Sequence, residues 1–280
     1  MIFDSVFCKT FSQSCYVFLC GGAGREHIRN KVRTQLENNS FQVLYPEDLF
    51  MDMLNRDKKA DLLEYENLLA DNSDIICIIC ESIGSAVELG AFIQNEKIKQ
   101  KMIVAINQRY SRDKSFVMMG PVKHLQKTNR DNVVKYKNED SETLGNNLVR
   151  EFRRFRKHSK SNKNQSFSNL SAYIAFIPMI VYFFKTISRK ELHKNLKDLL
   201  KEKGTLPTKY NELFNVSIKY LVKSGGLITD FDTSEKDENL SLSPKGYSET
   251  YNLLNLSWAY NRTMLHDKIR CIILKGQLND

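Results

Sequence analysis

The chain has 280 residues, of which 41% are hydrophobic and 27% are charged. This composition is ordinary for a globular protein and excludes a disordered or collagen-like chain, and the length suffices for two domains or one large one. The net charge of +9 favours a polyanionic partner, and nucleic acid is the first candidate.

The six cysteines show no spacing typical of a disulfide framework. Four of them, at positions 15, 20, 77 and 80, fall in predicted strands. Metal and redox pairs share the spacing Cys77-x-x-Cys80, but here both intervening residues are isoleucines within a strand. We therefore expect buried thiols and a reducing, cytoplasmic location. The five histidines show no metal-ligand spacing, so we expect no metal site.

No segment predicts contact with a membrane. The first residues, Met1 to Asp4, lack the basic and apolar regions of a signal peptide. The most apolar segment, 172–184, is much shorter than the roughly 20 residues that span a bilayer, and it contains Pro178. We interpret it as a buried helix of a second domain.

Residues 15–157 alternate between strand and helix patterns. The expected strands are 15–20, 41–45, 74–80, 102–106 and 132–136. The expected helices are 25–38, a helix containing Leu62, Leu63, Leu68 and Leu69, a helix over about 85–96, and 141–158. Such alternation predicts a parallel sheet of the flavodoxin or Rossmann type with helices on both faces. We therefore assign 1–157 to a first, α/β domain.

Polar residues cluster where four of these strands end. The clusters are Gly21-Gly22, Pro46-Glu47-Asp48, the segment 81–88 and Asn107-Gln108-Arg109-Tyr110. Because ligands of such sheets bind outside the carboxyl ends of the strands, we expect one site formed by these loops. The segment 81–88 opens a helix, whose free N–H groups and dipole favour a phosphate or a sugar hydroxyl. We expect Glu88 in the first turn of that helix.

A basic helix end and a polar segment follow the α/β domain. We interpret residues 158–168 as a linker. The helix end before it is either a solvated last turn favoured by the helix dipole or a phosphate-binding surface. Phe152 and Phe155, interleaved with the basic residues, can pack on the sheet or on a partner. The basic residues are Arg150, Arg153, Arg154, Arg156 and Lys157.

Residues 169–280 predict a mainly helical domain with a late hairpin. Helices are expected over 170–185, after Ser188, and over about 208–222, followed by a hairpin from 227–229 and 240–242 and a helix that starts near Pro244. This order is that of a winged helix, a variant of the helix-turn-helix.

The wing of this domain departs from the usual pattern because it is acidic. Five carboxylates there are poorly suited to a DNA groove. The domain therefore either contacts a protein, or contacts nucleic acid through its third helix. The carboxylates are Asp230, Asp232, Glu235, Asp237 and Glu238, and the lysines of the third helix are Lys209, Lys219 and Lys223.

The segment Ser82-x-Gly84-Ser85-x-x-Glu88-x-Gly90 resembles the catalytic loop of nucleoside 2-deoxyribosyltransferases, whose pattern is Asp-x-Gly-Thr/Ser-x-x-Glu-x-Gly. The resemblance implies that Glu88 attacks the anomeric carbon of a sugar and displaces the base. A carboxylate suits this task because cleavage of an N-glycosidic bond passes through an oxocarbenium-like state. The alternative is that Glu88 merely complements a helix dipole.

The family's Asp falls on Ser82, so the general acid that protonates the leaving base is in doubt. Glu81 is adjacent and can substitute for it. A cationic base such as nicotinamide leaves without protonation, so the loss matters less for NAD than for ordinary nucleosides.

Five separated motifs, given at the end of this paragraph in chain order, resemble those of the effector proteins of type II retrons. That resemblance implies a toxic glycosidase of an antiphage system, acting on NAD or a related nucleotide as substrate and needing no cofactor. It also implies a reverse transcriptase and its RNA–DNA hybrid (msDNA) as partners that hold the effector inactive or assemble it, and self-assembly into an oligomer or filament. The motifs are Phe18 to Gly22, Tyr45 to Phe50, Leu63 to Ala70, Glu81 to Phe92, and Lys114-Ser115-Phe116 with Gly120-Pro121-Val122.

Carried onto this chain, the resemblance gives Glu88 as the catalytic carboxylate. The expected substrate-binding residues are Gly21, Gly22, Glu47, Asp48, Glu81, Ser82, Gly84, Ser85 and Asn107. Glu47 and Asp48 can instead be helix caps, and Asn107 can be a plain turn residue. The rival hypothesis is a non-catalytic regulator that senses a nucleotide and binds nucleic acid.

Overall fold

The computed structural model describes residues 1–22, 24, 26–45, 72–111, 114–128, 130–137, 140–158, 167, 170–232, 237–255 and 262–278. The chain forms two compact units. One unit is Cys15–Ser161, and the other combines Met1–Ser14 with Asn162–Asp280. We predicted a first domain that begins at residue 1, but Met1–Ser14 belongs to the C-terminal unit.

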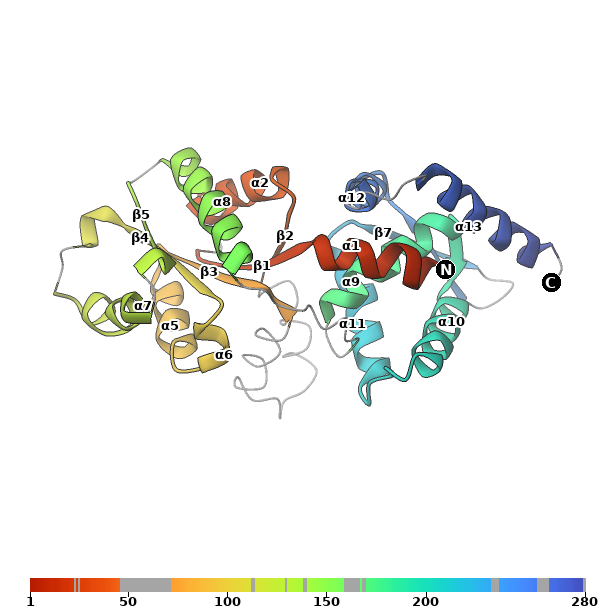
Figure 1. Ribbon diagram of the computed structural model, residues 1–280, viewed down its shortest axis with the longest axis horizontal. Helices are drawn as coiled ribbons and strands as arrows, with labels where there is room; N and C mark the ends of the chain where they lie inside the picture. The colour runs from red at the N-terminus through yellow and green to blue at the C-terminus, as the bar shows by residue number, and fades with distance from the viewer. Residues whose placement is uncertain are drawn as a thin grey trace. The chain divides into compact units, whose positions relative to one another are not determined.

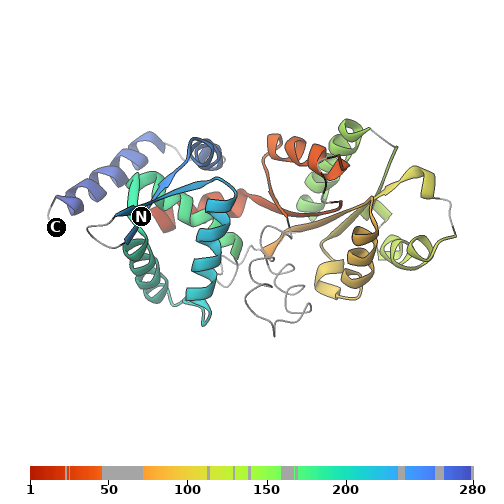
Figure 2. The same cartoon turned by 180° about the vertical axis from the view of Figure 1, so that it is seen from behind.

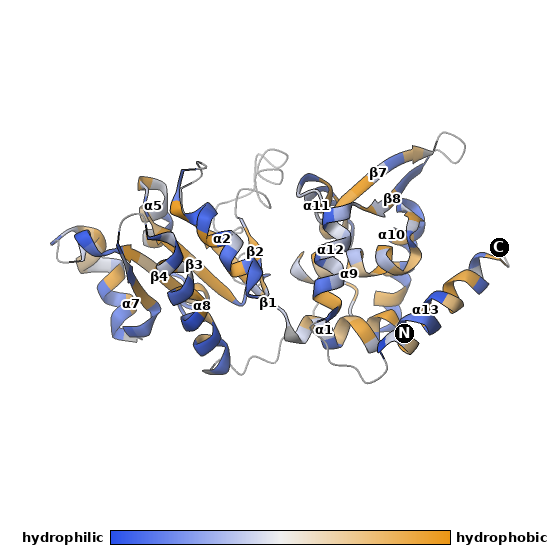
Figure 3. Cartoon of the chain, turned by 90° about the horizontal axis from the view of Figure 1, so that it is seen from above, coloured by the Kyte–Doolittle hydropathy of each residue, from blue (hydrophilic) through white to orange (hydrophobic). Residues whose placement is uncertain are grey.

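The first unit is built on a five-stranded parallel sheet in the order β2-β1-β3-β4-β5, which confirms the predicted flavodoxin-like fold class. Most strand residues are buried, as expected for a parallel sheet with both faces covered. Figure 3 shows the strands of this sheet coloured mainly as hydrophobic. The strands are β1 (Cys15–Cys20), β2 (Phe41–Leu44), β3 (Ile75–Cys80), β4 (Met102–Asn107) and β5 (Val133–Tyr136).

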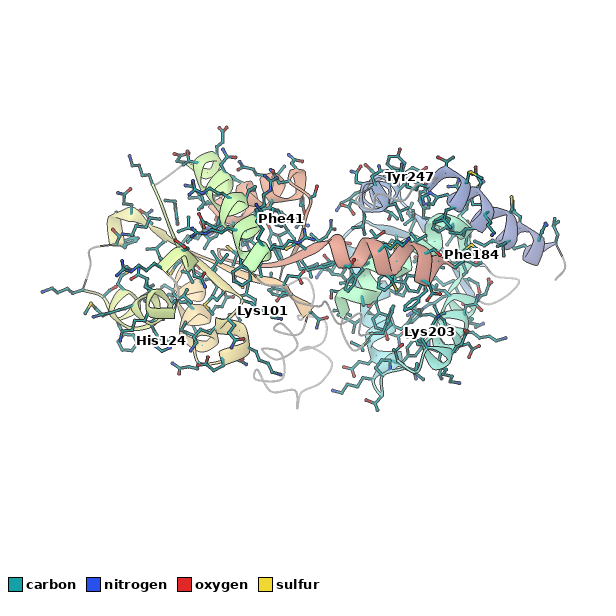
Figure 4. All side chains as sticks on the ribbon, in the orientation of Figure 1. Phe41, Lys101, His124, Phe184, Lys203 and Tyr247 are labelled. Carbon is teal, nitrogen blue, oxygen red and sulfur yellow. The ribbon has the colours of Figure 1, made fainter. Side chains whose placement is uncertain are left out.

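Helices α2 (Ile28–Asn38) and α8 (Ser141–His158) lie together on one face of this sheet (Figure 1). Phe152 of α8 is fully buried and meets Phe41 edge to face, with ring centroids 5.4 Å apart. Phe41 is labelled in Figure 4. The opposite face is covered by α5 (Ile83–Phe92), α6 (Glu96–Lys99) and α7 (Lys123–Thr128). Short helical segments are η2 (Gln108–Tyr110), η3 (Met118–Val122) and η4 (Arg130–Asn132).

Two helices of this unit differ from the prediction. The helix expected over 25–38 begins at Ile28. The helix expected over about 85–96 is divided into α5 and α6, because Ser82 caps the first and Asn95 caps the second by accepting from the N–H groups of Lys97 and Ile98. The expected helix with Leu62, Leu63, Leu68 and Leu69 lies outside the described residues.

The second unit has the element order of a winged helix. Its sheet is antiparallel in the order β6-β8-β7, so β8 of the wing hairpin pairs with the short strand β6, which we did not predict. Figure 2 gives the view from behind. The elements are α9 (Leu170–Phe184), β6 (Thr186–Ser188), α10 (Arg189–Glu202), α11 (Tyr210–Lys223), β7 (Leu227–Asp232), β8 (Asp237–Leu242), α12 (Pro244–Asn255) and α13 (Arg262–Gln277).

The N-terminal segment belongs to this second unit through an aromatic cluster. A π-helix, η1 (Ile2–Phe7), continues into α1 (Cys8–Gln13). Phe7 is fully buried, with its ring centroid 4.7 Å from that of Phe176 on α9 and 5.4 Å from that of Phe167. Phe167 lies in the segment that we predicted as a linker, yet it is fully buried. That prediction is wrong at this position, because a phenylalanine gains from burial in an aromatic core.

Helix α9 is the buried centre of the second unit. Most of its side chains are buried, including Tyr173, Phe176 and Ile177, as predicted for the apolar segment around Pro178. None of the helices in the described part of the chain combines the length and the apolar character that a membrane span requires.

Candidate functional site

The strand order of the sheet reverses between β1 and β3. These two strands are neighbours, but the connection after β1 leads to β2 on one side, whereas β3 and the later strands lie on the other. Ligands of such sheets bind where the strand order reverses in this way. Gly21 and Gly22 follow β1, and Glu81 and Ser82 follow β3, so the structure brings these predicted residues together.

Ser82 is the N-cap of α5. Its hydroxyl accepts the N–H of Ser85 at 3.2 Å, and the hydroxyl of Ser85 accepts the N–H of Ser82 at 3.0 Å. This reciprocal arrangement is a capping box. Ser85 is 1% exposed and also donates to the carbonyl of Ser82, so its hydroxyl is engaged within the protein. Ser82 remains partly exposed and is the member of the pair that a ligand can reach.

Glu88 lies in the second turn of α5. We predicted the first turn, and this is wrong because the helix begins at Ile83 after the Ser82 cap. The side chain is half-buried, with its Oε2 atom shielded from solvent. On the same helix Gly84 is exposed, and a Cβ added there would meet only Ser82 Oγ at 3.8 Å. Packing within the protein therefore does not require glycine at position 84, and the close approach of a ligand stays the role that the resemblance implies.

Glu81 connects the loops after β1 and β3. Its carboxylate accepts backbone N–H groups from Gly22 at 3.2 Å, Ile28 at 2.9 Å and Arg29 at 3.2 Å. The side chain is 10% exposed. A negative charge at the N-terminus of α2 is favourable, because the first N–H groups of a helix have no partner within the helix. Glu81 thus holds the position at which a ligand's phosphate would otherwise meet this helix.

The two glycines after β1 make room for protein side chains. A Cβ at Gly21 would lie 3.1 Å from Glu81 Oε1 and from Arg29 Cδ, and a Cβ at Gly22 would lie 2.3 Å from the ring of His27. We predicted that these glycines let a ligand's phosphate or ribose approach. In the structure they allow Glu81, Arg29 and His27 to pack against the loop.

Three residues near the carboxyl ends of β1 and β3 were not among the predicted site residues, namely His27, Arg29 and Tyr45. His27 Nδ1 lies 3.3 Å from Glu81 Oε2. Arg29 is 3% exposed, and its guanidinium carbon lies 4.3 Å from the centre of the Tyr45 ring. His27 and Arg29 stand near a glycine-rich loop and Tyr45 at the end of a strand, which was the available signal, but we considered histidines only as candidate metal ligands.

Asn107, at the end of β4, is buried. Its Oδ1 accepts the N–H of Arg109 at 3.1 Å, so it caps η2, and the turn role that we kept as an alternative is observed. Beside it in register, Tyr136 ends β5. Burial first, and then the negative charge of Glu81, raise the pKa of Tyr136 to about 12. Tyr136 is therefore a neutral phenol at physiological pH.

The predicted residues Glu47 and Asp48 lie outside the described residues.

The cysteine pair does not form a metal site. Cys77 and Cys80 are free thiols, and because they are three residues apart on a strand their side chains point to opposite faces of the sheet. Burial raises the pKa of both thiols. Among the residues that the structure describes, no group of three or more His, Cys, Asp or Glu side chains is close enough to hold a metal ion.

The basic end of α8 is partly neutralised by its own neighbours. Phe152 and Phe155 of this helix pack on the sheet. Arg154 pairs with Asp131 at 2.9 Å and Arg153 donates to Asn39 at 2.9 Å. Arg150 pairs with Glu151, and all five basic residues of this helix end are exposed.

The three lysines predicted on the third helix of the winged-helix unit share the solvent side of α11. Lys209 is its N-cap and is exposed, Lys223 is exposed, and Lys219 is half-buried. Their spacing puts all three on one face of the helix, with Glu212 between them.

Two of the five wing carboxylates have structural roles. Asp237 is buried and accepts the N–H groups of Glu238 at 2.8 Å and Lys190 at 3.1 Å. Burial disfavours its charged form, but these N–H donors outweigh that effect and lower the pKa of Asp237. Glu238 pairs with Arg189 at 2.7 Å. Asp230 is exposed, and Glu235 lies outside the described residues.

The bonds of Glu81 predict a measurable effect on stability. Glu81→Ala removes the acceptor of three backbone N–H groups, so we expect the free energy of unfolding to fall by about 1–3 kcal/mol. Urea denaturation monitored by circular dichroism measures this change. Glu26→Ala is the matched control because that carboxylate is 77% exposed. Equal stability of the two variants would contradict the bonding described here.

Comparisons with known proteins agree on one family. A family model described as STM3845 retron effector protein matches residues 23–229. The chain is similar to a protein of Escherichia coli retron Ec86, named as a candidate ribosyltransferase/DNA-binding protein, with 34% identity over 141 residues, 49% of this chain and 46% of that protein. A protein of the same name from Escherichia coli retron Ec73 is 32% identical over 118 residues, 39% of this chain and 37% of that protein. The chain thus matches less than half the length of either relative.

Proposed function

Because the chain belongs to the STM3845 retron effector family, we propose that it is the toxic effector of a retron defence system and acts as an N-glycosidase. Its proposed reaction is cleavage of the bond between base and ribose in NAD or a related nucleotide. Glu88 supplies the carboxylate that stabilises or attacks the anomeric carbon. The substrate is the only small molecule that this reaction needs, besides water.

One observation carries this proposal. The segment that resembles the catalytic loop of nucleoside 2-deoxyribosyltransferases lies at the carboxyl end of β3, where the strand order reverses, with Glu88 in the second turn of the helix that follows. The ribosyltransferase names of the two Escherichia coli relatives support the same class of chemistry.

The direct test is release of a free base by the purified protein. NAD and a panel of nucleotides are incubated with it, alone and with its retron partners, and the products are separated by chromatography. We expect a free base and the corresponding ribosyl product. Absence of any base release under all these conditions would contradict the proposal.

The rival function is a regulator that senses a nucleotide without cleaving it. Ser82, in place of the aspartate of the resembled family, favours it, because a serine is a poor proton donor to a leaving base. Under this function a nucleotide binds the protein with measurable affinity and remains intact.

The proposed partners are the retron reverse transcriptase and its RNA–DNA hybrid, with self-assembly of the effector into an oligomer or filament. Both proposed nucleic-acid surfaces are cationic: the end of α8 and the solvent side of α11. A polyanion binds such surfaces with release of counterions, so the affinity depends on salt.

Charge reversal at the end of α8 tests the first surface. Replacing Arg153, Arg154 and Arg156 by glutamate should weaken binding of the hybrid and reduce the slope of log affinity against log salt by about 0.7–0.9 per lost phosphate contact. Binding is measured by fluorescence anisotropy at several salt concentrations. The matched control reverses Lys114, Lys123 and Lys127, which are exposed elsewhere on the same unit. An unchanged slope in the arginine variant would exclude α8 from the interface.

A further inference from the structure

Glu81 and His27 form a carboxylate–imidazole pair within the candidate site. The carboxylate is held by the backbone N–H groups of Gly22, Ile28 and Arg29, and its Oε2 lies 3.3 Å from His27 Nδ1. The ring itself packs on Gly22, since a Cβ added at that position would lie 2.3 Å from it. The imidazole therefore lies between the Glu81 carboxylate and the loop after β1.

The other ring nitrogen faces the solvent side of this pair. His27 Nε2 lies 3.5 Å from a carboxylate oxygen of Glu26, whose side chain is 77% exposed. An exposed side chain is displaced at small cost, so a ligand can take its place next to Nε2. The Nδ1 atom is thus oriented by the buried carboxylate of Glu81, and the Nε2 atom is available to a ligand. Histidines that transfer protons have this arrangement.

We propose that His27, positioned by Glu81, is the general acid that protonates the leaving base, and that the substrates therefore include nucleotides with a neutral purine base. This inference rests on the proposed N-glycosidase function. It assigns to His27 the task for which Ser82, at the position of the family's aspartate, is unsuited.

The location of His27 agrees with this task. It is the N-cap of α2 and follows the loop after β1, and Ser82 is the N-cap of α5 at the end of the neighbouring strand β3.

The proposed reaction proceeds in two balanced steps. In the first, a Glu88 oxygen forms a bond to the anomeric carbon while the C–N bond breaks, and the base takes both electrons of that bond together with the proton of His27 Nε2. In the second, water attacks the same carbon, its proton returns to His27, and the bond to Glu88 breaks with its electrons returning to the carboxylate. Both side chains end as they began.

The test compares two substrates that differ by one methyl group on the base and therefore in the need for protonation. GMP carries a neutral base, whereas the base of 7-methyl-GMP is already cationic and leaves without an acid. His27→Asn is the informative variant, because His27 makes no side-chain capping bond to α2 and asparagine is a good N-cap, so folding is preserved. The matched control is His124→Asn, an exposed histidine on α7 that is labelled in Figure 4.

We expect His27→Asn to lower kcat/KM for GMP by about 100-fold or more and to leave that for 7-methyl-GMP within about threefold of wild type. Equal losses on both substrates would show a merely structural role and would overturn the proposal. Wild-type cleavage of 7-methyl-GMP or NAD without cleavage of GMP would also overturn it, and would leave the N-glycosidase function intact. If no substrate is cleaved by the wild type, with or without its partners, the proposed function itself fails, and this inference with it.

Discussion

Glu88→Gln should lower the rate of base release by about 10³-fold or more, because the amide cannot carry the negative charge that stabilises or attacks the anomeric carbon. Glutamine keeps the size and the hydrogen-bonding capacity of the side chain, so the fold is expected to remain. In cells that express the chain alone, the wild type should deplete NAD or the cleaved nucleotide and arrest growth. The variant should do neither.

Two comparisons make this result specific to Glu88. Glu96→Gln is the matched control, because Glu96 belongs to the same unit and its side chain is 71% exposed. The melting temperature of each purified variant should equal that of the wild type. Full toxicity of Glu88→Gln would show that another residue, or another activity, kills the cell.

Phe7→Ala should lower the free energy of unfolding of the winged-helix unit by about 3–5 kcal/mol, because it empties the centre of a buried aromatic cluster. Phe7 contacts Phe3, Phe11, Phe167 and Phe176, with ring centroids between 4.7 and 5.7 Å away. The loss falls on the C-terminal unit although the residue stands near the N-terminus.

Hydrogen exchange followed by mass spectrometry separates the two units. The amides of α9 and α11 should exchange faster in Phe7→Ala, and those of β1 and β3 should not change. The matched control is Phe116→Ala, since Phe116 is 88% exposed. Faster exchange in β1 and β3 with unchanged α9 would contradict the assignment of residues 1–14 to the second unit.

The strands could be predicted from the sequence because each is a short, continuously apolar segment. Cys15–Cys20 and the helix Ser141–His158 are observed with the predicted bounds. Helix starts were less accurate, because they depend on which side chain caps the first turn. Ser82 and Ser85 both suit that role, and only the folded backbone shows that Ser82 is the N-cap. Strand β6 was missed because three residues, Thr186–Ser188, carry no periodic pattern.

The candidate site was only partly predictable for a different reason. The catalytic-loop resemblance rests on neighbours in sequence, and it identified the segment that opens α5. The bonds of Glu81 join residues 52 to 59 positions apart. No local pattern predicts such contacts, so neither the role of Glu81 in binding α2 nor the place of His27 beside it could be derived. The same holds for Phe7 and Phe167, which meet only in the folded second unit.

The second unit is formed by two separated segments of the chain, Met1–Ser14 and Asn162–Asp280, and this affects how the chain folds during synthesis. Phe7 leaves the ribosome 160 residues ahead of Phe167, because the whole α/β unit lies between them. At about 5–20 residues per second, its aromatic partners follow about 8–32 s later. The α/β unit can therefore be complete while the three N-terminal phenylalanines still expose apolar surface. That interval is a window in which a chaperone, a protease or another nascent chain can bind the N-terminal segment before the winged-helix unit closes over it.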